Sequence, residues 1–229
     1  MSGSAWQRIG GVAGIAFVVL FIANFFTPST PDADDPSAGL AREIADDRTG
    51  HMLSVYLDGA AIVAFLVFLT ALWTLLRRAE GEPGASTLAL IGGVILAATL
   101  LVADGVYLAL VQAADEGREA AAIRALLELD NAIFVPSGFA IAALYGGIAL
   151  SALPHRSLPP WLGWSAAAFA GLFLVSLLGV FSSDNEGGPL GIVFFVALML
   201  QFLWVLAASI LLIGRAGPEN PLTRQPVPA

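Results

Sequence analysis

The chain contains no cysteine and no lysine, and it has only two histidines. The missing cysteines exclude disulfides, thiol nucleophiles, iron–sulfur clusters and zinc sites with thiolate ligands. Two histidines are too few for a histidine-rich metal centre or for haem held by two histidines. We therefore expect no metal and no cofactor. All basic residues are arginine, which we interpret as codon bias in a GC-rich genome.

Charged residues are scarce as well. They make up 12% of the 229 residues, whereas soluble domains carry about 25%. Hydrophobic residues make up 58% of the chain, and the mean hydropathy is +0.83. A water-soluble fold of this length cannot bury so much apolar surface, so the sequence predicts an all-α, polytopic membrane bundle.

Six apolar runs are long enough to cross a bilayer as helices, which takes roughly 17–25 residues. We expect residues 1–229 to form a single six-span domain, with residues 216–229 as a disordered cytoplasmic tail. The predicted spans are residues 9–26, 53–76, 88–111, 132–153, 161–181 and 190–213.

The distribution of charge predicts the orientation of these spans. Arg77, Arg78, Arg156 and Arg215 lie close to span ends that face one side, and thirteen of the eighteen acidic residues lie in segments on the other side. Arginine is enriched in cytoplasmic loops. We expect a multi-pass protein of the bacterial cytoplasmic membrane with both termini in the cytoplasm.

Two outer connections have helical patterns of their own. In residues 31–50, Asp35 is a candidate N-cap, Pro36 suits the first helical position, and Leu40 and Ile44 are spaced for one face. In residues 115–130, Ile123, Leu126 and Leu127 share a face. The sequence predicts two short amphipathic helices, either lids over a binding site or simple covers of the bundle mouth.

The stretch from "SAGLAREIADDRTGHMLSVYLDGAAIVAFLVFLTALWTLLRRAEGEPG" to "LPPWLGW" resembles a family of small multi-span membrane proteins from high-GC bacteria. The shared features are an outer helix ending in Asp-Arg, a span closing on "LLRRAEG", a Gly-Gly pair in the third span and "LPxWLGW" opening the fifth. That family is a domain of unknown function. The resemblance therefore implies the architecture and transfers no activity and no site residue.

Two aspartates lie inside the predicted spans, each followed by glycine. By helical rise, Asp58 lies ~8 Å and Asp104 ~10 Å below the outer span ends. A charge inside a membrane is costly, and such residues commonly mark functional sites. Asn24 ends the first span on the same side, and Pro136 is expected to interrupt the start of the fourth span. The predicted polar pocket comprises Asp58, Asp104, Tyr107, Ser54, His51, Ser137 and Asn131.

Two functions fit this pattern. In the first, the protein is a small transporter or a cation- or proton-responsive binder, because two carboxylates without a basic partner would share protons or bind a cation. In the second, it is a non-transporting structural or regulatory bundle, and the aspartates only fix helix packing. The partners we expect are the lipid bilayer, a small cation, a proton or a small polar ligand, and a second copy or another membrane protein.

Other function classes lack their signatures. The sequence has no nucleophile–base pair, no HExxH, no phosphate-binding glycine loop and no basic patch for nucleic acid. The "YLDG" and "VADG" segments also depart from the motifs of intramembrane aspartyl proteases. We therefore predict neither an enzyme nor a nucleic-acid-binding protein.

Small residues recur at helical spacing in several spans. Such stripes allow close packing of membrane helices, so we expect them at helix contacts within the bundle, with a dimer interface as the alternative. They are Gly10 and Gly14, Gly93 and Ala97, and Gly138, Ala142 and Gly146.

Overall fold

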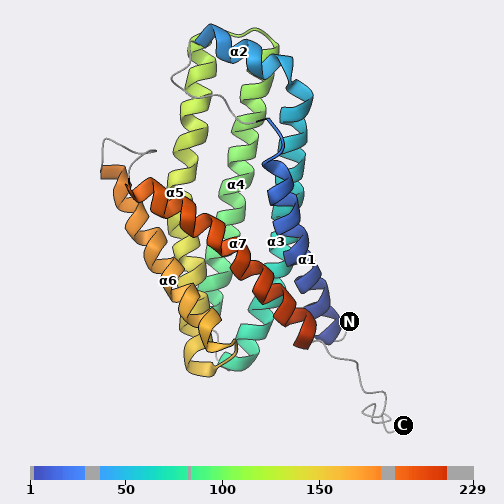
Figure 1. Ribbon diagram of the computed structural model, residues 1–229, viewed down its shortest axis with the longest axis vertical. Coiled ribbons are helices and arrows are strands. Elements are labelled where there is room, and N and C mark those ends of the chain that lie inside the picture. The colour runs from blue at the N-terminus through green and yellow to red at the C-terminus, as the bar shows by residue number, and fades with distance from the viewer. Residues whose placement is uncertain (1–2, 29–36, 82–83, 182–188, 216–229) are drawn as a thin grey trace.

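The computed structural model describes residues 3–28, 37–81, 84–181 and 189–215, and all the regular elements within these ranges are helices. The predicted tail at 216–229 and the candidate capping residues Asp35 and Pro36 lie outside the described residues. The elements, labelled in Figure 1, are α1 (Gly3–Asn24), α2 (Ser37–Asp46), α3 (Arg48–Glu80), α4 (Ala85–Asp115), α5 (Ala120–His155), α6 (Pro160–Ser176), the short 3₁₀ helix η1 (Leu177–Phe181) and α7 (Pro189–Arg215).

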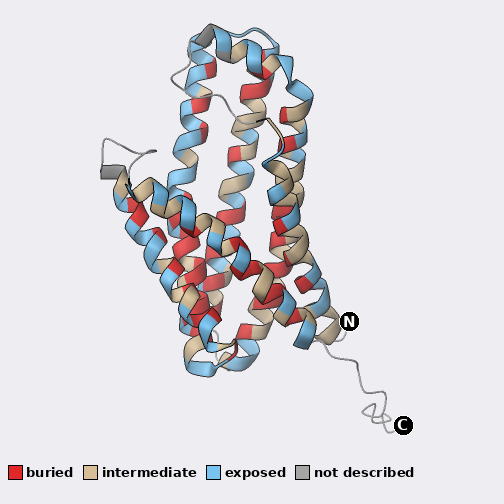
Figure 2. Cartoon of the chain, in the orientation of Figure 1, coloured by how far each residue is buried: buried red, intermediate tan, exposed pale blue. Residues whose placement is uncertain are grey.

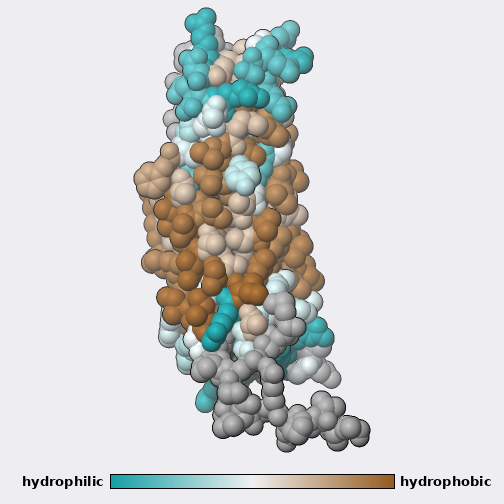
Figure 3. Space-filling model, turned by 90° about the vertical axis from the view of Figure 1, so that its right-hand side faces the viewer, coloured by the Kyte–Doolittle hydropathy of each residue, from teal (hydrophilic) through white to brown (hydrophobic). Residues whose placement is uncertain are grey.

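Six of these helices are long and apolar enough to cross a membrane: α1, α3, α4, α5, α6 with the start of η1, and α7. Large hydrophobic side chains remain exposed along them, and Figure 3 shows a brown band across the middle of the visible face, with polar residues toward the ends. An apolar outer surface of this kind is stable in lipid. The chain is a multi-pass, all-α membrane protein, as the sequence predicts.

The membrane helices follow one another around the bundle in chain order. α1 packs on α3, α3 on α4, α4 on α5, α5 on α6, and α6 on α7, and α7 closes the ring against α1. α7 crosses the bundle at a slant, and it ends beside the start of α1 (Figure 1). The start of α1 and the end of α7 therefore lie at one end of the bundle, and α2 covers the other, which we call the α2 end.

Three helices extend beyond their predicted spans at the α2 end. α3 begins at Arg48, where the Asp47 carboxylate accepts a hydrogen bond of 3.3 Å from Gly50 N. α4 continues to Asp115. α5 begins at Ala120 and runs without a break to His155. The apolar runs underestimate the length of these helices, because the helical turns at the α2 end are polar and lie outside the hydrophobic band.

The continuous α5 corrects two expectations. Residues 115–130 contain no separate amphipathic helix, since from Ala120 onward they form the first turns of α5. Pro136 does not interrupt the span either. Its side chain is exposed, so its ring displaces no packed neighbour. The missing N–H of a proline removes one helical hydrogen bond, and here the helix tolerates that loss.

α3 ends at Glu80 and α4 begins at Ala85, so the connection between them is shorter than the gap between the predicted spans. Gly81 has φ 79°, a conformation that favours glycine. The Glu80 carboxylate then accepts hydrogen bonds from Ala85 N (2.9 Å) and Ser86 N (3.1 Å) at the start of α4. This carboxylate satisfies N–H groups that have no partner inside the helix, and it fixes α3 and α4 as tight antiparallel neighbours.

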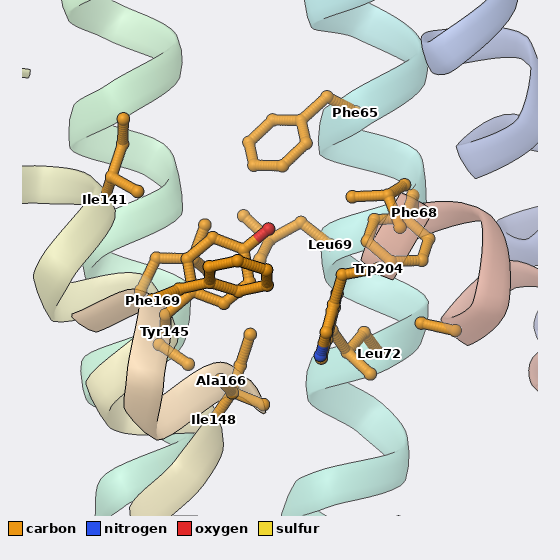
Figure 4. Packing of buried hydrophobic residues seen from close by; sticks show 14 of the residues in the cluster. Phe65, Phe68, Leu69, Leu72, Ile141, Tyr145, Ile148, Ala166, Phe169 and Trp204 are labelled. Carbon is orange, nitrogen blue, oxygen red and sulfur yellow. The ribbon is translucent and has the colours of Figure 1, made fainter. Parts of the chain in front are cut away.

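Buried side chains form two separate apolar clusters. The larger one, the main core, lies where all six membrane helices converge (Figure 2), and its centre is aromatic. Tyr145 stacks edge-on against Phe169 and Trp204, each with a centroid distance of 5.3 Å (Figure 4). Trp204 Nε1 donates a hydrogen bond of 3.0 Å to Leu162 O. The second, which we call the cap cluster, lies beneath α2 and consists of Ile44, Leu110, Val111, Ala114, Ile123 and Leu127.

Glycines occupy the closest helix contacts. Gly10 lies against Ala71, and Gly14 lies against Phe68 and Ser209, as their spacing predicts. The tightest approach of α4 to α5 involves two other glycines. A Cβ at Gly92 would lie 2.5 Å from Leu144 N, and one at Gly147 would lie 2.3 Å from Ala89 N. These two positions bring the backbones of α4 and α5 into direct contact.

Candidate functional site

Three aspartates from three neighbouring helices lie at one level of the bundle. Asp58 lies ten residues from the start of α3, Asp104 eleven from the end of α4, and Asp130 ten from the start of α5. At 1.5 Å per residue each is ~15–17 Å from the α2 end of its helix. Asp104 interacts electrostatically with both Asp58 and Asp130. We call these three residues the acid layer.

Asn24 connects α1 to the acid layer. Its side-chain Nδ2 donates a hydrogen bond of 2.9 Å to Asp58 Oδ2. Its Oδ1 accepts hydrogen bonds from Ser54 Oγ (2.7 Å) and Thr27 Oγ1 (2.9 Å). The amide thus joins the end of α1 to two positions one turn apart on α3. Because Asn24 ends α1, this contact also fixes the register of α1 against α3.

His51 and Tyr107 form a second polar contact, between α3 and α4. A hydrogen bond of 2.6 Å joins His51 Nδ1 to the Tyr107 hydroxyl, and the two rings meet edge-on with a centroid distance of 5.9 Å. His51 is 1% exposed. The pair lies about one to two turns from Asp58 and Asp104 toward the α2 end. It therefore separates the acid layer from the cap cluster.

Asp104 and Asp130 lack hydrogen-bond partners within the described part of the chain. Asp104 Oδ2 is buried and unbonded. Asp130 is 7% exposed, and we find neither a hydrogen bond nor an ion pair for it among the described residues. A buried carboxylate that is neither paired nor hydrogen-bonded is unfavourable when it is ionised. The carboxyl oxygens of these two acids are therefore available to take up a proton, accept a hydrogen bond or bind a cation.

No arginine neutralises the acid layer within the described ranges. The ion pairs found there are Arg48–Asp115 (3.2 Å), Arg118–Glu116 (2.7 Å) and Arg124–Glu128 (3.7 Å), all at the α2 end beyond the layer. Metal chelation is not built in either, because the described residues contain no group of three His, Asp or Glu close enough to hold an ion. The layer is spread over three helices, and no basic side chain in the described part of the chain forms an ion pair with it.

The cap cluster covers the acid layer along the bundle axis. On α4 it begins at Leu110, one to two turns beyond Asp104, and on α5 it ends at Leu127, one turn before Asp130. Ile44 of α2 is 1% exposed and packs into this cluster. The path from the α2 end is thus closed by apolar side chains. Asp58 and Asp104 are nevertheless partly exposed between the helices.

The length of helix between the acid layer and the opposite end of α3 is close to the thickness of a bilayer's hydrocarbon core. Counted along α3, Asp58 is ~28 Å from Arg77 at the opposite end of the helix. The hydrocarbon core of a bilayer is ~30 Å thick. If Arg77 lies at one boundary, the acid layer lies at the other. Between these levels the bundle interior is the main core.

The seven predicted pocket residues are only partly brought together. Ser54 and Asp58 share the Asn24 amide, His51 bonds Tyr107, and Asp104 interacts with Asp58. Ser137 is buried, but its hydroxyl donates to Phe134 O of its own helix. Asn131 is exposed on the outside of α5, so it does not belong to the layer.

Asp130 is the residue that the sequence reasoning missed. It lies next to Asn131 at the end of the segment that we expected to form a separate outer helix. The signal was present, because Ile123, Leu127 and Asp130 follow the spacing of one helix face, and the structure buries all three. Asp130 is on the buried stripe, and Asn131 is one residue off it.

No protein-family model matches this chain, and no curated protein or solved structure shows significant similarity to it. The resemblance noted from the sequence therefore stays a prediction, and the site has to be interpreted from its own chemistry.

Proposed function

We propose that this protein is a cation- or proton-responsive membrane protein whose binding group is the acid layer. Two observations carry the proposal. Asp104, one of whose carboxyl oxygens is buried and unbonded, and the buried Asp130 have no partner within the described chain, and Asp104 interacts with a third acid, Asp58. Ionisable residues inside membrane bundles are typically functional because they are costly to keep. A bound proton or cation removes that cost.

The ligand is a proton or a small monovalent cation rather than a chelated divalent metal. A metal such as Zn²⁺ requires three or four ligands converging within about 2 Å, and the described acids do not converge in that way. A proton requires only one carboxylate, and a monovalent cation is held loosely by a few oxygens and water. The amide and hydroxyl oxygens of Asn24 and Ser54 lie beside Asp58 as further oxygen ligands.

The proposal takes the α2 end to face outward from the bacterial cytoplasmic membrane. Arg77, Arg78, Arg156 and Arg215 all lie at or next to helix ends on the opposite side, and arginine is enriched on the cytoplasmic side. In this orientation both termini are cytoplasmic. The acid layer then responds to the pH or cation content outside the cell, and α2 is a lid over it.

A small transporter built on the same layer needs a path through the main core. Phe65, Phe68, Tyr145, Phe169 and Trp204 fill that region (Figure 4). These aromatic side chains would have to move apart for an ion to pass. The packing therefore favours a binding protein over a transporter. Such a protein would change its stability or its partner when the ion binds.

The second candidate is a structural or regulatory bundle that partners other membrane proteins. It is favoured by the Asn24–Asp58 hydrogen bond, since a polar contact of this kind fixes two membrane helices against each other. In that case the acids contribute to packing only, and neither protons nor cations change the protein.

Thermal unfolding of the detergent-purified protein at pH 5 and pH 8 tests the proposal. Ionised carboxylates repel one another and lose hydration in the folded layer, whereas protonated ones do not, so the wild type should be more stable at pH 5. Asp58→Asn, Asp104→Asn and Asp130→Asn should each reduce this difference by several degrees in Tm, since 1 kcal/mol shifts Tm by about 2–4 °C at this size. At pH 8, sodium or potassium chloride should stabilise the wild type more than the same concentration of a bulky organic cation salt.

Two controls separate the layer from other titrating groups. Glu119→Gln removes an exposed carboxylate at the α2 end and should leave the pH difference unchanged. His51→Phe removes the histidine that lies near the layer and interacts with Asp47 and Glu43. A wild type with equal stability at both pH values, indifferent to cations, would leave the structural bundle as the function.

A further inference from the structure

A groove at the end opposite α2 lies outside the site described above. It has a volume of about 340 Å³ and runs along the turn between α5 and α6. Its lining residues are Ala152, Leu153, Arg156, Leu158, Pro160 and Trp164. All of them except Arg156 are apolar or aromatic, so the groove combines one positive charge with an apolar wall.

Arg156 is held in an unusual backbone conformation. It ends α5 with φ 49° and ψ 33°, in the left-handed region, and it is the only non-glycine with positive φ among the described residues. Glycine normally occupies this position after a helix, because a Cβ is disfavoured there. Such outliers often occur at sites that bind a ligand.

The charge of Arg156 is not neutralised within the described residues. None of the ion pairs found there includes it, and its side chain is exposed. A second guanidinium lies at the same turn, where Arg215 Nη1 donates a hydrogen bond of 2.6 Å to Ser157 O. The turn from His155 to Pro160 contains no acidic residue. The groove therefore attracts an anion.

The exposed tryptophans indicate what kind of anion fits. Trp164 is 67% exposed and Trp161 is 59% exposed, both on the first turns of α6. Tryptophan at this exposure is typical of the headgroup level of a membrane. Leu153 and Trp164 form an apolar wall beside Arg156, which suits the glycerol and upper acyl region of a lipid whose phosphate contacts the guanidinium. We propose that this groove binds the headgroup phosphate of an anionic phospholipid, with Arg156 contacting the phosphate and Trp164 the glycerol region.

The test is a lipid titration of the full-length protein in mixed micelles. Thermal stability is followed as phosphatidylglycerol or phosphatidylcholine is added, and native mass spectrometry counts the retained lipids. The wild type should be stabilised by phosphatidylglycerol and should retain it. Arg156→Gln should weaken the apparent affinity about tenfold, as expected for the loss of one charge-assisted contact. Arg78→Gln, which removes an exposed arginine of α3 at the same end, should keep the wild-type response.

Arg156→Gly distinguishes the binding role from a folding role. Glycine suits the left-handed conformation, so without lipid this variant should be at least as stable as the wild type. With phosphatidylglycerol it should nevertheless fall behind, because the guanidinium is gone. Equal responses of Arg156→Gly and the wild type would overturn the proposal. So would full stabilisation by soluble glycerol phosphate, since that would indicate a site for a free phosphate rather than a lipid.

Discussion

Asn24, the last residue of α1, donates its side-chain hydrogen bond to Asp58 of α3 at 2.9 Å, while its oxygen accepts from Ser54 one turn away. One amide thus satisfies a carboxylate and a hydroxyl at once. Asp58 is therefore the acid of the layer with a defined partner, and Asp104 and Asp130 are the acids with spare capacity. The predictions below separate these roles.

Replacing Asn24 by alanine should show how much free energy is lost when the Asp58 carboxylate has no hydrogen-bond donor. In Asn24→Ala the Asp58 carboxylate loses its donor, and we expect a loss of about 1–3 kcal/mol in the free energy of unfolding. In the double variant Asn24→Ala/Asp58→Ala the donor and the carboxylate are both gone, so the total loss should be smaller than the sum of the two single losses. Chemical or thermal unfolding in detergent measures this cycle. Additive losses would mean that the two side chains do not interact.

Substitution by alanine should have opposite effects on stability at a glycine in a tight helix contact and at a glycine with free space around it. Gly92→Ala places a Cβ against the backbone of α5 at Leu144 and should destabilise the bundle by about 1–3 kcal/mol. Gly105→Ala meets no atom within 4 Å and should stabilise α4 by about 0.5–1 kcal/mol. Both substitutions lie on the same helix and add the same atom, so each serves as the control for the other in a thermal unfolding series.

The lid role of α2 depends on Ile44. Ile44→Ala removes most of the side chain that α2 buries in the cap cluster, and a change of this kind costs about 2–5 kcal/mol at a packed site. Because α2 is short, we expect it to detach while the membrane helices stay folded. Hydrogen exchange should then rise in residues 37–46 and at the start of α5, but not in the middle of α4. Arg42→Ala, on the exposed side of α2, should change nothing.

The orientation can be tested with single cysteines, because the native chain contains none. Cysteine at Glu43 on α2 should react with an impermeant thiol reagent in intact cells. Cysteine at Ala79, exposed at the opposite end of α3, should react only after the membrane has been opened. The reverse labelling pattern would mean that the protein has the opposite orientation, with the acid layer on the cytoplasmic side.

The sequence predicted the number, type and order of the membrane helices because hydrophobic length alone determines them. It did not predict where α3, α4 and α5 end, since polar turns beyond the bilayer carry no hydropathy signal. For the same reason Asp130 was assigned to a separate outer segment, although its spacing from Ile123 and Leu127 marked it as buried. The sequence shows that Asn24 is polar, but its hydrogen bond to Asp58 depends on the register of α1 against α3. No local sequence pattern predicts that register.

The order of helices around the ring has a consequence for synthesis. Each helix that leaves the ribosome finds its predecessor already inserted as a packing partner, except that α1 contacts both α3 and α7. The face of α1 that carries Gly11 and Gly14 is therefore exposed to lipid until α7, with Ser209 and Ile213, has been inserted. Termination of the chain before α7 would leave this small-residue stripe uncovered. A product that ends before α7 should accordingly be captured by other membrane helices or degraded, whereas in a chain that includes α7 this helix covers the stripe.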